Sequence, residues 1–291
     1  MESLAEQTLF GSPFDIIDEG SPPCHPSTRH YIIEAAQKFY NISQSKKILW
    51  LSGPAGVGKT AIMRSIIQTG KSRIGAALFF SRSNKRTDPR RFVQTIAYQL
   101  AKNVPGYQQY VRDQLCADPM LLHSGTKHLF ERLVEVPFCN RPYHKKDEPW
   151  LILIDGLDEC EGEEAQCEIV EIIGAFVCRC PTSPLVWIVA SRAEYWLRAA
   201  FNQKNFQHCF CQEHIEINSQ DARRDVETYL SSEFQKIRRV FAHHLSGNDW
   251  PLEREFSELS QAASGMFLFA SAASRFIADP TQSTSYRLYS L

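Results

Sequence analysis

The sequence predicts an α/β fold, in which helices cover both faces of a parallel sheet, followed by a smaller helical domain. Up to about residue 219, short apolar runs alternate with amphipathic helical segments. Such alternation is typical of parallel strands joined by crossover helices. From Asp221 onward the pattern is helical only. We therefore place a domain boundary near residue 219.

Length and composition agree with such a fold. The chain has 291 residues, of which 43% are hydrophobic and 22% charged, and its formal net charge is −1. A chain of this length buries enough surface for a core that needs no disulfides. The composition excludes a wholly disordered, collagenous or coiled-coil protein. The balanced charge argues against a general attraction to nucleic acid or anionic lipid.

The N-terminal region argues against targeting to a membrane or for export. It contains acidic residues and no lysine or arginine before Arg29, whereas signal peptides begin with basic residues and transit peptides avoid acids. No apolar stretch approaches the roughly 20 residues of a membrane span. We therefore predict a soluble, cytoplasmic protein without membrane association. Residues 1–23, rich in serine, proline and acids, are predicted to be disordered.

The cysteines give a weaker indication. The chain has nine, an odd number, which favours reduced thiols in a reducing compartment. Structural zinc sites usually space their cysteines C-x₂₋₄-C, and C-x-C is tighter than that. We therefore predict apolar packing residues rather than zinc ligands at the two close pairs and their flanking histidines: Cys178 and Cys180, and Cys209 and Cys211 with His208 and His214.

The elements of the first half follow from apolar spacing and helix-ending residues. Two short apolar runs have the length of buried strands, Lys46–Ser52 and Ala76–Phe80. The helical segments are Thr28–Tyr40; Lys59–Thr69, ended by Gly70; a helix that begins at Asp88 and Pro89; Tyr107–Leu115; and Thr126–Val136.

The second half adds three strands and four helices. The predicted strands are Trp150–Ile154, Leu185–Ala190 and His214–Ile217, with a polar loop at Phe138–Pro149. The predicted helices are Glu163–Arg179, Asp221–Leu245, Pro251–Ala263 and Gly265–Ala278.

A phosphate-binding loop is the strongest motif. The segment GPAGVGKT matches G-x-x-x-x-G-K-[ST] and lies between a predicted strand and a predicted helix, the context that supports the motif. Its glycines let backbone N–H groups surround a phosphate, and the following helix adds the positive end of its dipole. Lys59 is expected to contact the β- and γ-phosphates, and Thr60 to offer its hydroxyl to Mg²⁺. The predicted nucleotide-binding residues are Gly53, Pro54, Ala55, Gly56, Val57, Gly58, Lys59 and Thr60.

Acidic residues follow the apolar strand that begins at Trp150. The carboxyl ends of parallel strands line the ligand crevice of such sheets. Asp155 is therefore predicted to hold Mg²⁺, directly or through water. Asp158 or Glu159 is predicted to orient or deprotonate the attacking water.

An arginine follows the next strand. Strand Leu185–Ala190 is followed by Ser191 and Arg192, and an arginine at this strand end can reach the γ-phosphate and respond to its presence. The alternative is a surface arginine paired with Glu194 or another nearby acid.

Three segments, GPAGVGKT, LILIDGLDEC and VWIVASR, resemble the NACHT branch of the STAND nucleotide-driven signalling ATPases. The resemblance is closest to a fungal set whose core is similar to the nephrocystin-3-like N-terminal module, and it covers nearly the whole chain from about residue 24, including the lead-in CHPSTR. It implies a five-stranded parallel sheet with an extra strand between the two Walker motifs, for which Ala76–Phe80 is the candidate. It also implies that Asp155 is the magnesium acid, that Asp158 and Glu159 act in hydrolysis, and that Arg192 is the sensor.

The N-terminal composition, the change to a helical pattern and the extent of the resemblance together give the domain boundaries. They are a disordered segment at 1–23, a nucleotide-binding domain at 24–219 and an incomplete helical domain at 220–291. Members of the family continue into a winged-helix domain and a repeat array, and we expect this sequence to be truncated before both.

The combined features predict a Mg-ATP-binding signalling switch with weak ATP hydrolysis and ATP, ADP and Mg²⁺ as cofactors. One alternative is a non-catalytic nucleotide-binding adaptor that oligomerises. Another is a small-molecule kinase, whose lid would be the basic segment with Arg82, Lys85, Arg86, Arg90 and Arg91. No N-K-x-D guanine signature occurs, and the preference for ATP over GTP depends on the resemblance.

Partner predictions follow from the helices after Asp221. Their apolar faces are expected to lie partly uncovered and to drive weak self-association, with a closed monomer as the alternative. Nucleic acid is not an expected partner, and the residues do not specify a downstream signalling partner. The apolar positions are Val226, Tyr229, Leu230, Phe256, Leu259, Phe267 and Leu268.

Overall fold

The computed structural model describes residues 1–9, 22–42, 46–140, 143, 148–241 and 250–279. The chain forms two compact units. The first contains Met1–Pro23, Ile32–Ser52 and Lys59–His214. The second contains Cys24–Tyr31, Gly53–Gly58 and the chain from Ile215 onward. The phosphate loop and the lead-in segment thus group with the helices that follow the sheet.

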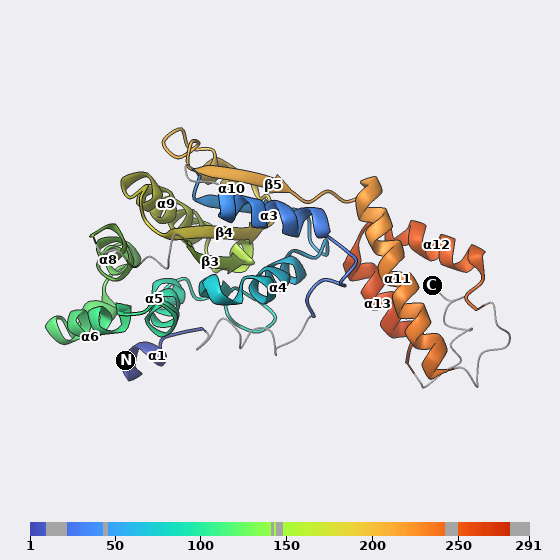
Figure 1. Ribbon diagram of the computed structural model, residues 1–291, viewed down its shortest axis with the longest axis horizontal. Helices are drawn as coiled ribbons and strands as arrows, with labels where there is room; N and C mark the ends of the chain where they lie inside the picture. Colours follow the sequence, from blue (N-terminus) through green and yellow to red (C-terminus); the bar gives the residue numbers. More distant parts are fainter. Residues whose placement is uncertain (10–21, 43–45, 141–142, 144–147, 242–249, 280–291) are drawn as a thin grey trace. The chain divides into compact units, whose positions relative to one another are not determined.

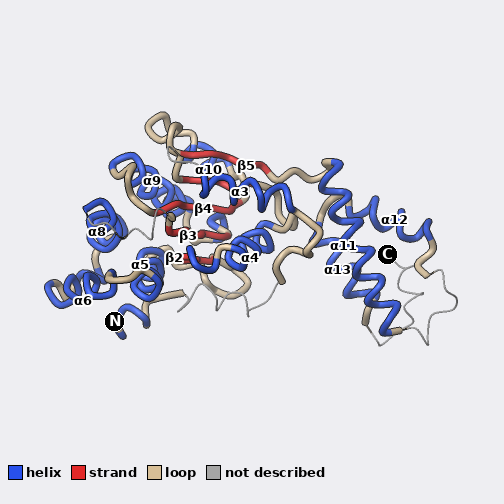
Figure 2. The backbone as a smooth tube through the Cα atoms, viewed as in Figure 1, coloured by secondary structure: helices blue, strands red, loops and turns tan. Residues whose placement is uncertain are grey.

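A five-stranded parallel sheet forms the centre of the first unit, as predicted (Figures 1 and 2). Its order is β2-β3-β4-β1-β5. The extra strand β2 thus precedes β3 in sequence but lies at the sheet edge, and β4 separates β1 from β3. The strands are β1 (Ile48–Ser52), β2 (Ile74–Phe79), β3 (Trp150–Asp155), β4 (Leu185–Ser191) and β5 (Phe210–His214).

Helices alternate with these strands and continue after them. Short 3₁₀ turns occur at Lys71–Arg73, Leu121–His123 and Leu157–Glu159, and Glu131–Glu135 is π-helical. The α-helices are α1 (Glu2–Ala5), α3 (His30–Ile42), α4 (Lys59–Thr69), α5 (Arg91–Asn103), α6 (Tyr107–Ala117), α7 (Thr126–Phe130), α8 (Val136–Asn140), α9 (Glu163–Arg179), α10 (Tyr195–Phe201), α11 (Gln220–Val240), α12 (Glu253–Ala263) and α13 (Phe267–Ile277).

Both faces of the inner strands are buried. In β3, Ile152 and Ile154 belong to one core with α5 and α9, whereas Leu151 and Leu153 point to the opposite face, as the alternation of a strand requires. Helix α4 packs against β3 and β4. This burial on both sides explains why the strands are continuous apolar runs in the sequence.

Several elements differ from the predicted ones, among them helix Thr126–Val136, which is divided between α7, a π-helical segment and the start of α8. The last strand is β5 at Phe210–His214 and not His214–Ile217, because β5 is a partly exposed edge strand that pairs only with β1 and needs no apolar run. Helix α10 was not predicted. The predicted polar loop at Phe138–Pro149 begins in helix α8, and residues 141–142 and 144–147 of it lie outside the described part of the chain.

The N-terminus also differs from the expected disorder. Glu2–Ala5 form helix α1, which packs against α5 and buries Leu4 completely. The backbone N–H of Leu9 donates to the hydroxyl of Thr95 on α5, at 2.9 Å. Nη1 of Arg91 on the same helix donates to the carbonyl of Thr8 at 3.2 Å. A buried apolar residue and two hydrogen bonds therefore anchor these residues. Residues 10–21 of the predicted segment lie outside the described ones.

The helices of the second unit cover one another. The side chain of Ser219 caps α11 by accepting the N–H of Ala222. Val226 and Leu230 on α11 share a buried cluster with Leu259 on α12 and with residues of α13. Of the seven apolar positions expected to lie uncovered, Val226, Leu230 and Leu259 are thus buried within this unit, whereas Leu268 is 58% exposed. Residues 242–245 of the predicted helix lie outside the described residues.

One pair of cysteines is bonded, contrary to the expectation of reduced thiols. Cys139 at the end of α8 and Cys180, directly after α9, form a disulfide with their Cα atoms 5.4 Å apart. The sequence gives no local sign of this pairing, because the two cysteines are 41 positions apart.

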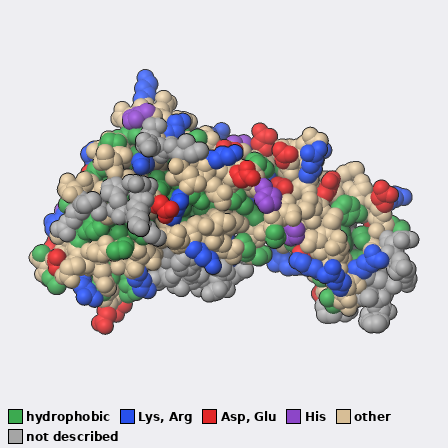
Figure 3. All heavy atoms as spheres, viewed as in Figure 1, with side chains coloured by type: hydrophobic (Ala, Val, Ile, Leu, Met, Phe, Trp, Pro, Cys, Tyr) green, Lys and Arg blue, Asp and Glu red, His purple; other side chains and the backbone are tan. Residues whose placement is uncertain are grey.

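The surface carries charges of both signs. Figure 3 shows acidic and basic side chains distributed over the visible face, in agreement with the balanced charge sum. Within the described residues, no helix is both long enough and apolar enough to cross a membrane.

Candidate nucleotide-binding site

The phosphate motif has the predicted local structure. Strand β1 leads into the loop Gly53–Gly58, and α4 begins at Lys59. Gly56 and Gly58 have φ angles of 78° and 96°, in the left-handed region that favours glycine. A Cβ atom added at Gly58 would meet no other atom within 4 Å. The backbone at this glycine is therefore open to a ligand.

Two hydrogen bonds orient the peptide groups of this loop. The N–H of Leu268 donates to the carbonyl of Gly56 at 3.0 Å, and Nη2 of Arg29 donates to the carbonyl of Val57 at 3.1 Å. The C=O and N–H of one trans peptide point in opposite directions. Holding these oxygens therefore turns the N–H groups of Val57 and Gly58 away from Arg29 and Leu268, as donors for an anion.

Arg29 is buried, with 1% of its surface exposed. Its backbone N–H donates to Oδ2 of Asp225 at 3.1 Å, its Nε lies 3.9 Å from the same oxygen, and its Cζ lies 5.0 Å from the centroid of the Phe267 ring. These contacts hold Arg29 at a φ of 57°, which is unusual for a residue with a side chain. Sequence reasoning named Arg29 only within the lead-in segment, because no local pattern reveals partners about 200 residues away.

Asp155 and Thr60 form the expected oxygen pair. Asp155 ends β3 and is 4% exposed, and the Thr60 hydroxyl donates a hydrogen bond to its carboxylate. Burial raises the pKa of Asp155 to about 6, against the opposing effects of this hydrogen bond and of the Lys59 charge. A carboxylate and a hydroxyl are hard oxygen ligands, and Mg²⁺ in nucleotide sites is held by few protein oxygens together with phosphates. The two residues therefore fit Mg²⁺.

Lys59 lies among the carboxylates of the predicted site. Burial lowers the pKa of its ammonium, and the negative charges of Asp158 and Asp155, and more weakly Glu159, oppose that shift. The structure thus brings together the predicted lysine and all three predicted acids, which come from α4, from the end of β3 and from the turn that follows it.

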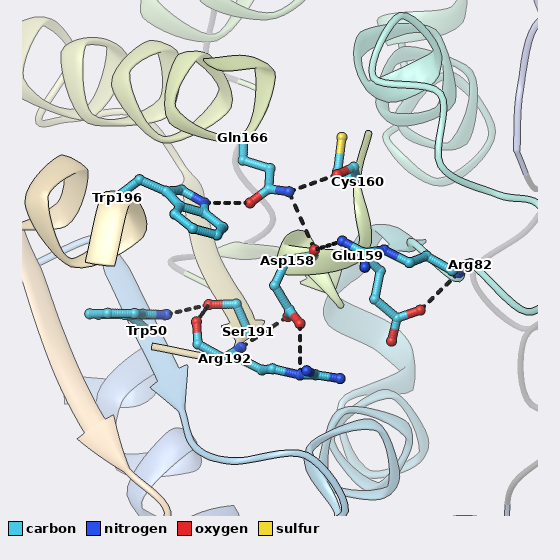
Figure 4. Close-up of polar contacts among 9 residues, drawn as sticks. All are labelled: Trp50, Arg82, Asp158, Glu159, Cys160, Gln166, Ser191, Arg192 and Trp196. Atoms are coloured by element: carbon cyan, nitrogen blue, oxygen red, sulfur yellow. Dashed lines mark hydrogen bonds and ion pairs between the residues drawn. The ribbon is translucent and has the colours of Figure 1, made fainter. Parts of the chain in front are cut away.

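Asp158 and Arg192 form an ion pair (Figure 4). Nε of Arg192 lies 3.2 Å from Oδ2 of Asp158, and the backbone N–H of Arg192 donates to Oδ1 at 2.9 Å. The Asp158 side chain is 8% exposed and that of Arg192 51%. Both carboxylate oxygens of Asp158 are thus engaged with Arg192, so the nearby acid of the alternative interpretation is Asp158, which belongs to the site, rather than Glu194.

Glu159 has a different environment, also shown in Figure 4. Its Oε2 accepts the backbone N–H of Arg82 at 2.8 Å. The buried Gln166 of α9 holds the turn itself, because its Nε2 donates to the carbonyls of Asp158 and Cys160 while Trp196 donates to its Oε1. No sequence signal singled out Gln166 for this role.

A pocket of about 400 Å³ adjoins Glu159. Its lining includes Arg82, Gln166 and Trp196, and the segment from Cys160 to Glu163. Arg82 of the predicted basic lid therefore lies at this pocket, whereas the Arg90 side chain is 85% exposed and pairs with Asp88.

Comparisons with known proteins agree with this arrangement. The sequence matches the family described as Nephrocystin 3, N-terminal, over residues 28–192, more than half of the chain. It is 25% identical over 251 residues to the vegetative incompatibility protein HET-E-1 of Podospora anserina; the match covers 81% of this chain but only 17% of that relative. The fold is similar to that of the Walker-type ATPase PABY2304 of Pyrococcus abyssi, with a TM-score of 0.58, 10% identity and coverage of 94% and 75% of the two chains. The predicted resemblance to the nephrocystin-3-like module is confirmed, and the chain belongs to the nephrocystin-3 N-terminal family.

Proposed function

We propose that this chain is a Mg-ATP-binding signalling module that hydrolyses ATP slowly and changes state with the bound nucleotide. One observation carries the proposal: the Thr60 hydroxyl, the Lys59 ammonium and the Asp155 carboxylate meet at the end of β3. The match to the nephrocystin-3 N-terminal family and the ATPase-like fold support it.

Each residue has a proposed part. The loop N–H groups and Lys59 bind the phosphates, and Thr60 and Asp155 hold Mg²⁺, which when bound neutralises charge between the β- and γ-phosphates. Glu159 orients and deprotonates the attacking water. Asp158, engaged with Arg192, positions that arginine for the γ-phosphate.

The test measures binding and product together. ATP, ADP and GTP affinities of the purified chain are measured with and without Mg²⁺, and the fate of the γ-phosphate is followed. Inorganic phosphate as the product supports the ATPase, transfer to an added acceptor supports the kinase alternative, and binding without turnover supports the adaptor. Failure to bind any of these nucleotides overturns the proposal. Light scattering in the same samples tests the self-association expected of an adaptor.

Replacing Glu159 by glutamine is expected to lower turnover by about 10²-fold, the usual scale for a positioned base. ATP affinity should change little, because Gln still accepts the N–H of Arg82. Single-turnover hydrolysis and equilibrium binding separate the two effects.

The matched comparison is Asp158→Asn, one residue away. This change weakens the ion pair with Arg192, so we expect a smaller loss of turnover, and the double variant with Arg192→Ala should lose no more turnover than Arg192→Ala alone. If Glu159→Gln hydrolyses ATP at the wild-type rate, Glu159 is not the general base.

Arg29 is proposed to couple the phosphate loop to the helices of the second unit, because it contacts Val57, Asp225 and Phe267. Arg29→Ala should weaken ATP binding by about tenfold or more, since a charge-assisted hydrogen bond of about 1.5 kcal/mol or more is lost. The effect is measured by equilibrium binding, with melting temperature recorded in the absence of nucleotide.

The control is Arg90→Ala, which removes a highly exposed arginine and should leave affinity unchanged. Arg29→Lys keeps the charge but lacks the planar fork, and should recover only part of the affinity. If Arg29→Ala melts earlier yet binds ATP normally, Arg29 is structural and does not orient the loop.

A further inference from the structure

Three metal-ligating side chains meet at the end of α9, far along the chain from the phosphate loop. Cys178 lies in the last turn of that helix, and His208 and Cys209 directly precede β5. The two Sγ atoms are 3.0 Å apart, and Cys178 Sγ lies 3.9 Å from His208 Nε2. All three ligand atoms lie within 4.8 Å of one another. We call this set the Cys178 cluster.

The packing of α9 explains why the cluster forms. Gly174, one turn before Cys178, faces the buried ring of Phe206, and a Cβ added there would lie only 2.8 Å from that ring. A glycine is therefore needed for the segment after α10 to approach α9 so closely. Positions four apart share one face of a helix, so the contact that seats Phe206 also places Cys209 beside Cys178.

The backbone around Cys209 is fixed independently of any ligand. Its N–H donates to the carbonyl of Phe206 at 2.9 Å, which closes a turn. Its own carbonyl accepts the N–H groups of Lys47 and Ile48, at 2.9 and 3.1 Å, at the start of β1. Cys209 is buried, Cys178 is half-buried and His208 is exposed, so the cluster is anchored on one side and open to solvent on the other.

We propose that Cys178, His208 and Cys209 bind a thiophilic divalent cation, Zn²⁺ in the first instance, as a structural site. Two thiolates and an imidazole form a known zinc donor set, and sulfur ligands select against Mg²⁺. The carbonyl of Asn205, 3.4 Å from Cys178 Sγ, or a water molecule fills the fourth position. On binding, the two S–H bonds break, two protons pass to solvent and two Zn–S bonds form.

The distances fit this ion after small side-chain rotations. In a tetrahedral site the ~2.3 Å Zn–S and ~2.0 Å Zn–N bonds place two sulfurs ~3.8 Å apart and sulfur and nitrogen ~3.5 Å apart. The two sulfur atoms, now 3.0 Å apart, must separate by about 0.8 Å, and Cys178 Sγ and His208 Nε2, now 3.9 Å apart, must approach by about 0.4 Å. Neither C-x-C pair of the sequence supplies both thiols of the cluster. Cys180 is bonded to Cys139, and the cluster takes Cys178 from one pair and Cys209 from the other.

The ion would stabilise the partly exposed edge of the sheet. Strand β5 pairs only with β1 and is partly exposed. A metal ion bound between the end of α9 and the residue before β5 would hold the start of this edge strand against the helix. Bound Zn²⁺ should therefore raise the melting temperature of the chain, because a ligand that binds the folded state stabilises it.

The experiment uses the full chain, reduced with a phosphine and freed of metal by a chelator. Zn²⁺ is titrated and quantified by mass spectrometry, and Co²⁺ serves as the spectroscopic probe. We expect about one ion per chain, a sulfur-to-cobalt charge-transfer band, tetrahedral ligand-field bands and a higher melting temperature with Zn²⁺. Absence of the charge-transfer band or of bound Zn²⁺ overturns the proposal, as does a Cys178–Cys209 disulfide that persists under reduction.

The variants locate the ion. Cys178→Ser should weaken Co²⁺ binding by at least about tenfold, the minimum expected when even an outer partner of a ligand is lost. Cys178→His, which keeps a ligand, should retain the ion with a weaker charge-transfer band. Cys211→Ser, the thiol that the sequence pairs with Cys209, and Cys180→Ser are matched controls that should bind Co²⁺ normally. Unchanged binding in Cys178→Ser, or loss of binding in either control, overturns the assignment.

Discussion

Replacing Lys59 by alanine is expected to abolish ATP binding or weaken it by about 2 kcal/mol or more, which is roughly 30-fold in affinity. The charge-assisted contact to the phosphates is lost. In addition, the carboxylates of Asp155, Asp158 and Glu159 lose the positive charge beside them, and their negative charge then repels the polyphosphate. Isothermal titration with Mg-ATP and Mg-ADP measures the change.

The control is Lys71→Ala, which removes an exposed lysine from the turn after α4 and should leave affinity unchanged. Lys59→Met, which keeps the volume of the side chain but not its charge, should behave like Lys59→Ala. Unchanged ATP affinity in Lys59→Ala would contradict the assignment of GPAGVGKT as the phosphate loop.

Asp155→Asn is expected to act in opposite directions on stability and on Mg-ATP binding. Burial raises the pKa of Asp155 from 3.8 to about 6. Ionising it in the folded chain without Mg²⁺ therefore costs about 3 kcal/mol, at about 1.4 kcal/mol per pKa unit. Asparagine keeps the shape and still accepts from Thr60 but carries no charge. We expect the variant to unfold up to several degrees higher at pH 7–8, as roughly expected for a change of this size.

Folding stability should depend on pH in a direction set by the raised pKa of Asp155. Because the pKa of Asp155 is higher in the folded chain than in the unfolded one, the folded chain binds more protons between about pH 4 and 6. The stability of the wild type should therefore fall as pH rises through this window, and that of Asp155→Asn should not show this loss. Denaturant unfolding from pH 4 to 8 without Mg²⁺ measures the difference between the two proteins.

Binding should change in the other direction. A Mg²⁺ ligand of full charge is lost in Asp155→Asn, so the Mg-dependent part of ATP affinity should disappear. In the wild type that part should weaken as pH falls through about 6, because the carboxylate becomes protonated. Asp158→Asn is the contrasting variant: its charge is paired with Arg192, so its loss should not stabilise the chain. If Asp155→Asn is destabilised and its ATP binding depends on Mg²⁺ as in the wild type, Asp155 is not a Mg²⁺ ligand.

Local pattern determined much of the fold. Helices α4 and α9 have the bounds predicted from sequence, since Gly70 and the residues that flank each segment mark their ends. The apolar runs of β1, β3 and β4 predicted buried strands because each of these strands lies inside the sheet with both faces covered. Edge strand β5 was misplaced because one-sided pairing and partial exposure leave no such run.

The candidate site was predictable in its residue types. A phosphate loop after one strand and acids after another strand have a local signature, because phosphate and Mg²⁺ chemistry require particular side chains at particular strand ends. The separate environments of Asp158 and Glu159 were not predictable. One is engaged by Arg192 and the other by the backbone of Arg82, and these two residues follow β4 and β2.

The sequence by itself determined the alternation of strands and helices, the phosphate loop, and the lysine, threonine and carboxylates of the candidate site. Only the tertiary structure decided which distant residues meet: Arg29 with Val57 and Asp225, Cys139 with Cys180, and Cys178 with Cys209. The physical reason is that apolar periodicity and turn residues report how each segment is buried. The choice of partner is set by close packing between segments, such as Gly174 against Phe206, and leaves no periodic trace in the chain.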